Sequence, residues 1–288
     1  MMNHPGVLLM RALAHLPLSW LRTLGSLIGR VLFVLARSRR HVALTNLRLC
    51  FPEWSEAHRT DVARRSFIAF SQAFLDRAWV WHAPPEVVRR RIRLAGAVDD
   101  LRQGGALIIF APHFYGMDAG GSAVMQQALA HGSSIYTRQP DPVVDAWLRA
   151  GRQRFGDVIL LNRDEGLKPI VRSLREGRAL YLLPDMDFGP EDSIFVPFFG
   201  VPAATVPSLA RFARLGQARV VPVVTRMTPG GYEARVHPAW QHFPSDNLEA
   251  DTRRMNQRLE GYIREVPEQY YWVHKRFKTR PPGEPPIY

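Results

Sequence analysis

The stretch Ala106-Leu107-Ile108-Ile109-Phe110 and the segment after it, Ala111-Pro112-His113-Phe114-Tyr115-Gly116-Met117-Asp118, decide the fold of this chain. The first is a short, continuous apolar run, which is typical of a strand buried on both faces of a parallel sheet. The second carries Pro112 and Gly116, residue types that favour turns. We therefore predict a buried strand that ends near Phe110, a turn, and a helix that begins near Asp118.

His113 and Asp118 are the candidate catalytic residues of this segment. On one continuous helix a five-residue offset would separate their side chains by roughly 140°, so they can meet only if the chain changes structure between them. A strand, turn and helix would let the Asp118 carboxylate reach back to the imidazole. It would then orient His113 and stabilise the imidazolium formed when this base accepts a proton from a hydroxyl. The pattern H-x-x-x-x-D also recurs by chance, and its position after a predicted strand favours the general-base interpretation.

The alternation of strands and helices continues along the chain. Further short apolar runs predict strands at 134–137, 158–161, 179–183 and 219–224. Helix patterns lie between them, at 117–130, from Asp141-Pro142 onward, at 167–176 and at 205–215. This order predicts an α/β fold with a mostly parallel central sheet flanked by helices. Residues 55–81 indicate one or two further helices, 245–265 a closing helix, and the polar–apolar alternation of 232–237 a strand at the sheet edge.

Polar segments follow the predicted strands, where open α/β sheets collect their ligands. Arg138 follows the second strand, Arg163 the third, and Asp185 and Asp187 the fourth. We expect these residues to contribute to a substrate-binding site. The aromatic segment 194–201, which contains Phe198 and Phe199, is expected to form a wall that receives a hydrocarbon chain; ordinary core packing is the alternative.

The sequence pattern of the N-terminal region predicts a membrane-associated segment. We divide the chain into residues 1–45, an amphipathic helix with a basic cluster, and residues 46–288, the catalytic domain. A helix that begins at Pro17 would gather Arg22, Ser26, Arg30 and Arg37 into a narrow polar stripe on an otherwise apolar surface. This pattern favours a helix lying in the interface of an anionic membrane over a clean transmembrane span. A core helix of a soluble domain is the alternative.

Composition narrows the class of partner. The chain has 288 residues, 46% of them hydrophobic, and 38 Lys and Arg against 26 Asp and Glu, which gives a formal net charge of +12. Such an excess indicates a polyanionic partner: nucleic acid, an anionic bilayer or an acidic carrier protein. The single cysteine, Cys50, allows no internal disulfide and no zinc site built on cysteine pairs. No recognition-helix or RNA-binding signature supports nucleic acid.

Several blocks of the chain resemble the lauroyl/myristoyl acyltransferases of lipid A biosynthesis, and the match covers most of the sequence. The His113/Asp118 pair occupies the place of that family's H-x-x-x-x-[DE] motif. Longer matching blocks are Asn46-Leu47-Arg48-Leu49-Cys50-Phe51-Pro52-Glu53, Leu183-Pro184-Asp185-Met186-Asp187-Phe188-Gly189, Val196-Pro197-Phe198-Phe199-Gly200 with Ala203-Ala204-Thr205, and the tail from Pro267 to Pro281. Many relatives carry Glu in place of Asp118 and a longer N-terminal anchor.

The resemblance implies transfer of a fatty acyl group from an acyl carrier protein thioester to a hydroxyl of a lipid A precursor, a phosphorylated glycolipid. It implies an enzyme at the cytoplasmic face of the bacterial inner membrane, with no metal and no cofactor. His113 would be the general base and Asp118 its orienter. Arg138 and Arg163 would contact acceptor phosphate or thioester oxygen, while Asp185 and Asp187 would organise the site. A basic rim would then serve the carrier, the glycolipid and the anionic membrane surface, without nucleic acid.

Three other functions remain open from the sequence. One is an acyltransferase for another lipid acceptor, such as a lysophospholipid or ornithine lipid. A second is a glycosyltransferase that holds a metal ion through Asp185 and Asp187. The third is a non-catalytic basic protein of the membrane periphery.

Overall fold

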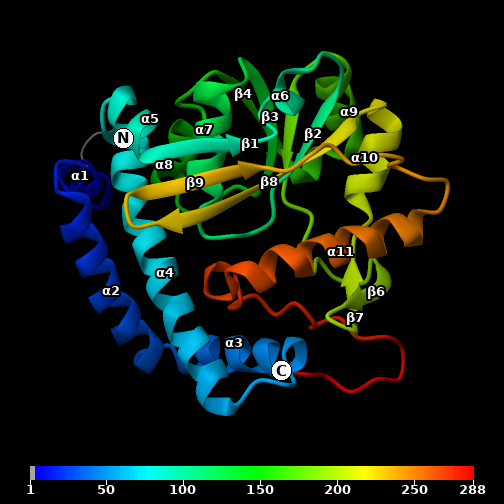
Figure 1. Ribbon diagram of the computed structural model, residues 1–288, viewed down its shortest axis with the longest axis horizontal. Coiled ribbons are helices and arrows are strands. Elements are labelled where there is room, and N and C mark those ends of the chain that lie inside the picture. The colour runs from blue at the N-terminus through cyan, green and yellow to red at the C-terminus, as the bar shows by residue number, and fades with distance from the viewer. Residues whose placement is uncertain (1–3) are drawn as a thin grey trace.

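The computed structural model describes residues 4–288 and has the expected α/β architecture (Figure 1). Its core is a seven-stranded sheet in the order β1-β9-β8-β2-β5-β3-β4, in which only the β8–β9 pair is antiparallel. In that order the strands are β1 (Ile92–Gly96), β9 (Gly231–Val236), β8 (Arg219–Thr228), β2 (Leu107–Phe110), β5 (Ala179–Leu182), β3 (His131–Tyr136) and β4 (Asp157–Asn162). The predicted mostly parallel sheet is thereby confirmed.

Five of the helices beside this sheet lie where the sequence patterns placed them, whereas the short helices at 85–91 and 99–102 were not predicted. The segment after Asp141 forms a helix because the Asp141 carboxylate accepts the first free N–H groups, from Val143 and Val144. The helices beyond the N-terminal region are α5 (Pro85–Arg91), α6 (Asp99–Arg102), α7 (Met117–Gln127), α8 (Pro142–Arg152), α9 (Leu167–Arg175), α10 (Ser208–Gly216) and α11 (Leu248–Glu265), with short 3₁₀ turns η1 (Arg163–Glu165) and η2 (Pro267–Gln269).

Strand β2 explains why the sheet is buried on both faces. Ile108 and Phe110 contribute to one hydrophobic core, whereas Leu107 and Ile109 contribute to another on the opposite face. Alternate residues of a strand point to opposite faces, so the continuous apolar run serves two cores at once. The strand therefore fixes the position of the loop that follows it and carries His113.

The strands differ from the sequence-based prediction in three places, the first of which is β1, where no strand was predicted. Strand β9 is not an edge strand, because β1 pairs alongside it in parallel register. Its polar residues form ion pairs: Glu233 binds Arg93, Arg226 and Arg235. Residues 194–205, for which no strands were predicted, form an antiparallel hairpin of β6 (Ile194–Phe198) and β7 (Val201–Thr205).

The N-terminal region packs four helices beside the sheet: α1 (Pro5–Leu13), α2 (Leu18–Leu35), α3 (Arg37–Cys50) and the single long helix α4 (Glu56–His82) (Figure 1). Helix α3 runs across the boundary that we placed between residues 45 and 46. Helix α2 is long and apolar enough to cross a membrane, and only 17% of its residues are buried. This low burial argues against the alternative of a core helix.

Helix α2 turns part of its polar stripe toward the protein. Arg22 forms an ion pair with Asp76 of α4 at 2.8 Å, and Gln72 of α4 donates to Ser26. Leu21 is buried, but seven other large apolar side chains of α2 are exposed: Trp20, Leu24, Leu27, Ile28, Val31, Val34 and Leu35. The expected arrangement, in which the whole stripe faces headgroups, is therefore wrong for Arg22 and Ser26.

Candidate active site

Three segments far apart in the sequence meet at the carboxyl end of the sheet. They are the loop after β2, the loop after β5, and residues 270–280, here called the C-terminal strap. The Tyr271 N–H donates to the carbonyl of His113 at 3.1 Å, and Phe114 forms an isolated antiparallel bridge with Tyr270. The strap therefore fixes the backbone that carries His113.

The imidazole of His113 is held by Asp185. Its Nδ1 lies 2.7 Å from Oδ1 of Asp185, and its backbone N–H donates to Oδ2 of the same carboxylate at 3.0 Å. The hydroxyl of Tyr270 also donates to Oδ2, at 3.0 Å. Asp185 is fully buried, while His113 remains slightly exposed. A carboxylate at Nδ1 fixes the proton there and leaves Nε2 as the basic nitrogen.

The charge of Asp185 is stabilised by its surroundings. Burial raises the pKa of this carboxyl group, but the imidazole and N–H of His113 and the hydroxyl of Tyr270 outweigh that effect and hold the pKa below its usual range. An ionised carboxylate at this position can stabilise an imidazolium formed at His113. The arrangement can therefore serve as a base and its orienting group.

Asp118 does not occupy the orienting position that we expected. It lies in the first turn of α7, where Oδ2 accepts from Arg77 of α4 at 2.8 Å and Oδ1 accepts from Arg152 of α8 at 3.0 Å. Both oxygens are thus directed to arginines, and the structure brings Asp185, not Asp118, to His113. Two strong donors compete better for a carboxylate than one imidazole.

Asp187 organises the strap. Its carboxylate accepts from the N–H and hydroxyl of Thr279 at 2.8 Å and 2.9 Å, and from the N–H of Gly189 at 2.9 Å. Asp185 and Asp187 therefore bind different protein donors and do not face a common point. Among residues 4–288 there is no group of three or more His, Cys, Asp or Glu side chains arranged to hold a metal ion.

The two predicted arginines follow the outer strands of the sheet and are both exposed. The guanidinium of Arg163 stacks on the ring of Phe188, 3.9 Å from its centroid, and so joins the end of β4 to the loop after β5. Arg138 lines a shallow pocket with Arg149 of α8. Each arginine retains a charged face that can bind an anion.

The aromatic segment 194–201 is packed against the protein and does not line an open wall. Phe198 is fully buried, with Phe199, Tyr270 and Phe277 as aromatic neighbours. Phe199 packs against Phe51. Core packing, the alternative that we kept open, therefore describes Phe198.

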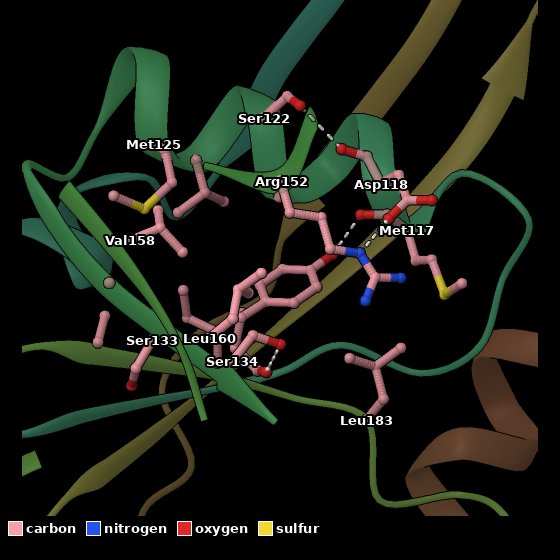
Figure 2. A pocket seen from close by; sticks show the side chains of 16 residues that line it. Met117, Asp118, Ser122, Met125, Ser133, Ser134, Arg152, Val158, Leu160 and Leu183 are labelled. Carbon is pink, nitrogen blue, oxygen red and sulfur yellow. Dashed lines mark hydrogen bonds and ion pairs between the residues drawn. The ribbon is translucent and has the colours of Figure 1, made fainter. Parts of the chain in front are cut away.

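An apolar pocket lies instead between α7 and the strands β3, β4 and β5 (Figure 2). Figure 2 shows Met117, Asp118 and Leu183 at one end and Met125 and Val158 at the other. The first end adjoins the His113 turn through Met117 and the Asp185 loop through Leu183. Its remaining lining residues are Ile109, Gly121, Ser122, Val124, Gly132, Ser133, Ser134, Arg152, Leu160, Ala179 and Tyr181.

Sequence reasoning missed several parts of this site. Arg77 and Arg152 carried no motif, because their role depends on how α4 and α8 pack beside α7. Tyr270 and His274 belong to the tail block quoted above, but the pattern gave no indication of their partners. A signal was present in that block, since several aromatic residues stand beside basic ones in a terminal segment, which is more often poorly ordered.

Comparison with known proteins identifies the family. Residues 2–279 match the family model described as bacterial lipid A biosynthesis acyltransferase. The chain belongs to this family. It is 35% identical to the lipid A biosynthesis myristoyltransferase of Escherichia coli (strain K12), over 97% of this chain and 87% of that protein. It is 33% identical to a lipid A biosynthesis acyltransferase of Haemophilus influenzae, covering 97% and 88% of the two chains.

The likeness extends to a relative with a different acyl group in its name. The lipid A biosynthesis lauroyltransferase of Escherichia coli is 31% identical, over 98% of this chain and 93% of that protein. Together these matches establish an acyltransferase of lipid A biosynthesis. The family match includes the His113 turn and the strap up to residue 279.

Proposed function

We propose that this acyltransferase moves a fatty acyl group from an acyl carrier protein thioester to a hydroxyl of a phosphorylated lipid A precursor. His113 Nε2 accepts the hydroxyl proton as the alcohol oxygen attacks the thioester carbonyl. The C–O bond forms, the C–S bond breaks, and the proton passes from His113 to the departing thiolate. Because a thioester is already activated, base catalysis and positioning are the main contributions asked of the protein.

The observation that carries this proposal is the hydrogen bond from His113 Nδ1 to the buried Asp185 carboxylate. It leaves Nε2 as the available base at the carboxyl end of a parallel sheet, where substrates of such folds bind. We assign the orienting role to Asp185. Asp118 instead holds Arg77 and Arg152 beside the apolar pocket.

We place the fatty chain in the apolar pocket of Figure 2, one end of which is lined by Met117, four residues after His113. Its far end is closed by Met125. A methyl group on Gly132 would come within 2.9 Å of the Met125 sulfur, and one on Gly156 within 2.7 Å of its terminal carbon. These two glycines thus give Met125 the room to form the floor of the pocket.

We expect two exposed arginines to bind the anionic partners, the phosphorylated acceptor and the acidic carrier protein. Arg138 and Arg163 lie at the carboxyl ends of neighbouring strands, at the edge of the sheet from which His113 projects. Their exposed guanidinium groups suit the phosphates of the acceptor, because Arg presents paired donors to phosphate oxygens. An acidic carrier protein would meet the same positive field as it delivers its acyl group.

We propose that the enzyme docks on the cytoplasmic face of the inner membrane through α2. The exposed apolar face of α2 continues into basic residues of α3 and the strap. Arg39 of α3 donates to the Val273 carbonyl of the strap, and Arg37, Lys275 and Lys278 are exposed. Apolar side chains beside exposed cations favour binding at an anionic bilayer surface.

The decisive experiment supplies purified enzyme with a panel of acyl carrier protein thioesters, the corresponding acyl-CoA and candidate lipid acceptors. Mass spectrometry of the lipid product identifies the donor and the acylated molecule. The expected result is transfer from the carrier thioester to the lipid A precursor. Transfer only from acyl-CoA, or only to a lysophospholipid, would contradict the proposal.

His113→Ala tests the assigned base. We expect this variant to lose about 10²–10⁴-fold in kcat, since no other group replaces the base, while lipid binding persists. His131→Ala is the matched control, because His131 is exposed on β3 and pairs with the exposed Asp157. Normal turnover in His113→Ala would refute the assignment.

A further inference from the structure

His274 has a fixed backbone within the C-terminal strap. Its carbonyl accepts from the Asn46 side chain at 2.7 Å, and its N–H donates to the Tyr271 carbonyl at 3.3 Å. Tyr271 in turn donates to the carbonyl of His113. The strap therefore ties the position of one histidine to that of the other.

The hydrogen bonds of His274 decide its tautomer. The N–H of Asp187 donates to Nε2 of His274 at 3.0 Å, so Nε2 is an acceptor and the ring proton resides on Nδ1. This Nδ1–H has no hydrogen-bond partner within residues 4–288, and it is not among the fully buried unpaired atoms of that range. An unpaired ring N–H therefore remains available, on a side chain close enough to His113 and Asp185 for their charges to act on it.

The charged neighbours of this ring are those of the proposed active site. Burial is the largest cause, and together with the positive charges of Arg276 and of a protonated His113 it lowers the pKa of His274 to about 4, although Asp185 and Asp187 act in the opposite direction. A proton on Nε2 would also point at the Asp187 N–H. The imidazole is therefore neutral at physiological pH and acts only as a donor through Nδ1.

We propose that the Nδ1–H of His274 donates a hydrogen bond to the carbonyl oxygen of the thioester and stabilises the oxyanion that forms there. This inference rests on the proposed function. As the alcohol adds to the carbonyl carbon, the C=O electron pair moves onto oxygen and the hydroxyl proton goes to His113. When the oxyanion collapses, the C–S bond breaks, the thiolate takes the proton from His113, and the His274 hydrogen bond weakens again.

A neutral donor suits a group that becomes charged only in the transition state. A cation such as Arg would bind the ground-state phosphates of the acceptor as well, and that binding would not favour the chemical step. Nδ1–H has no lone pair, and the lone pair of Nε2 is used by Asp187. His274 therefore cannot be the base, and its contribution is electrostatic.

A pair of substitutions separates this role from simple support of the strap. His274→Asn places an amide N–H close to the Nδ1 position but cannot reach the Asp187 N–H. His274→Gln places its carbonyl oxygen close to the Nε2 position, where it accepts from Asp187, and leaves no donor at Nδ1. Steady-state kinetics with the carrier thioester and the lipid A precursor, together with thermal unfolding of each variant, completes the test.

We expect His274→Gln to lose about 10²–10³-fold in kcat, as for removal of one oxyanion donor, with little change in either KM. His274→Asn should remain within about tenfold of the parent. The reverse order, equal losses in the two variants, or no loss in either would overturn the inference alone. A parent enzyme that transfers no acyl group would overturn the proposed function and this inference with it.

Discussion

At the scale of single residues, two aspartates near His113 have different partners and should differ in their effect on catalysis. Asp185 binds the imidazole directly, whereas Asp118 binds Arg77 and Arg152. Asp185→Asn should lower kcat by about 10³–10⁴-fold, because an amide can stabilise the wrong tautomer of the base and carries no charge for the imidazolium. Asp118→Asn should cost far less in kcat. Equal losses in kcat, measured under saturating substrates, would argue that the aspartates act together.

Asp118 also makes stability depend on pH. Burial raises the pKa of this carboxyl group, but Arg152 and Arg77 reverse the effect and lower the pKa from its usual 3.8 to about 2. A depressed pKa in the folded state stabilises the protein above the unfolded value. The contribution is about 2 kcal/mol at neutral pH and is lost as the pH falls from about 4 to about 2.

Urea unfolding at pH 7 and pH 3 tests this contribution. The difference in free energy of unfolding between the parent and Asp118→Asn should shrink by about 1 kcal/mol at pH 3. Asp246→Asn is the control, since the Asp246 side chain is exposed to solvent. A difference that is the same at both pH values would mean that the arginines do not hold the carboxylate ionised.

At the scale of elements, helix α2 depends on two glycines where it crosses α4. A methyl group on Gly29 would lie 2.4 Å from the Ile68 Cα, and one on Gly25 would lie 2.8 Å from the Gln72 Cα. These neighbours are backbone atoms of α4 and cannot swing aside. Gly29→Ala should therefore lower the free energy of unfolding by about 1–3 kcal/mol, as overpacking does.

Chemical denaturation of Gly29→Ala and of Gly104→Ala compares their free energies of unfolding and so tests the contact between Gly29 and α4. A methyl group at Gly104 meets nothing within 4 Å, so the control carries the same chemical change without the clash. Equal stability of the two variants would show that α2 is not seated on α4 through its glycines.

The same scale separates what the sequence could predict from what it could not. Local sequence patterns predict the strands β2 to β5 and the helices between them. Ile108 belongs to the apolar run of a buried strand, and Asp141 caps the helix that follows it. Local patterns do not predict that Asp185 is the partner of His113. The two residues are 72 positions apart in the sequence and meet because strands β2 and β5 are neighbours in the sheet. A local motif favours the nearest carboxylate, Asp118, whereas the packing of α4 and α8 gives that carboxylate to arginines.

At the scale of the whole molecule, the long-range segments of the fold close the site. The strap returns from the far end of the chain to donate from Tyr271 to His113, and Asn46 of α3 binds the strap at Trp272 and His274. The sequence marked the tail as distinctive but could not reveal these contacts, since each joins residues more than a hundred positions apart. Helix α2, with its exposed apolar face, belongs to the same group of N-terminal helices as α3 (Figure 1).

That arrangement predicts how the whole enzyme binds a membrane. Val31 and Val34 of α2 are 55% and 60% exposed and make no core contact, so their replacement should spare the fold. The double variant Val31→Asp with Val34→Asp should reduce flotation with anionic vesicles at least tenfold, because each carboxylate opposes insertion and repels the lipid charge. Leu215, also exposed but on α10, provides the control variant Leu215→Asp. Binding of the parent should weaken as salt rises, since the surface cations are screened; unchanged flotation of the double variant would exclude α2 as the contact.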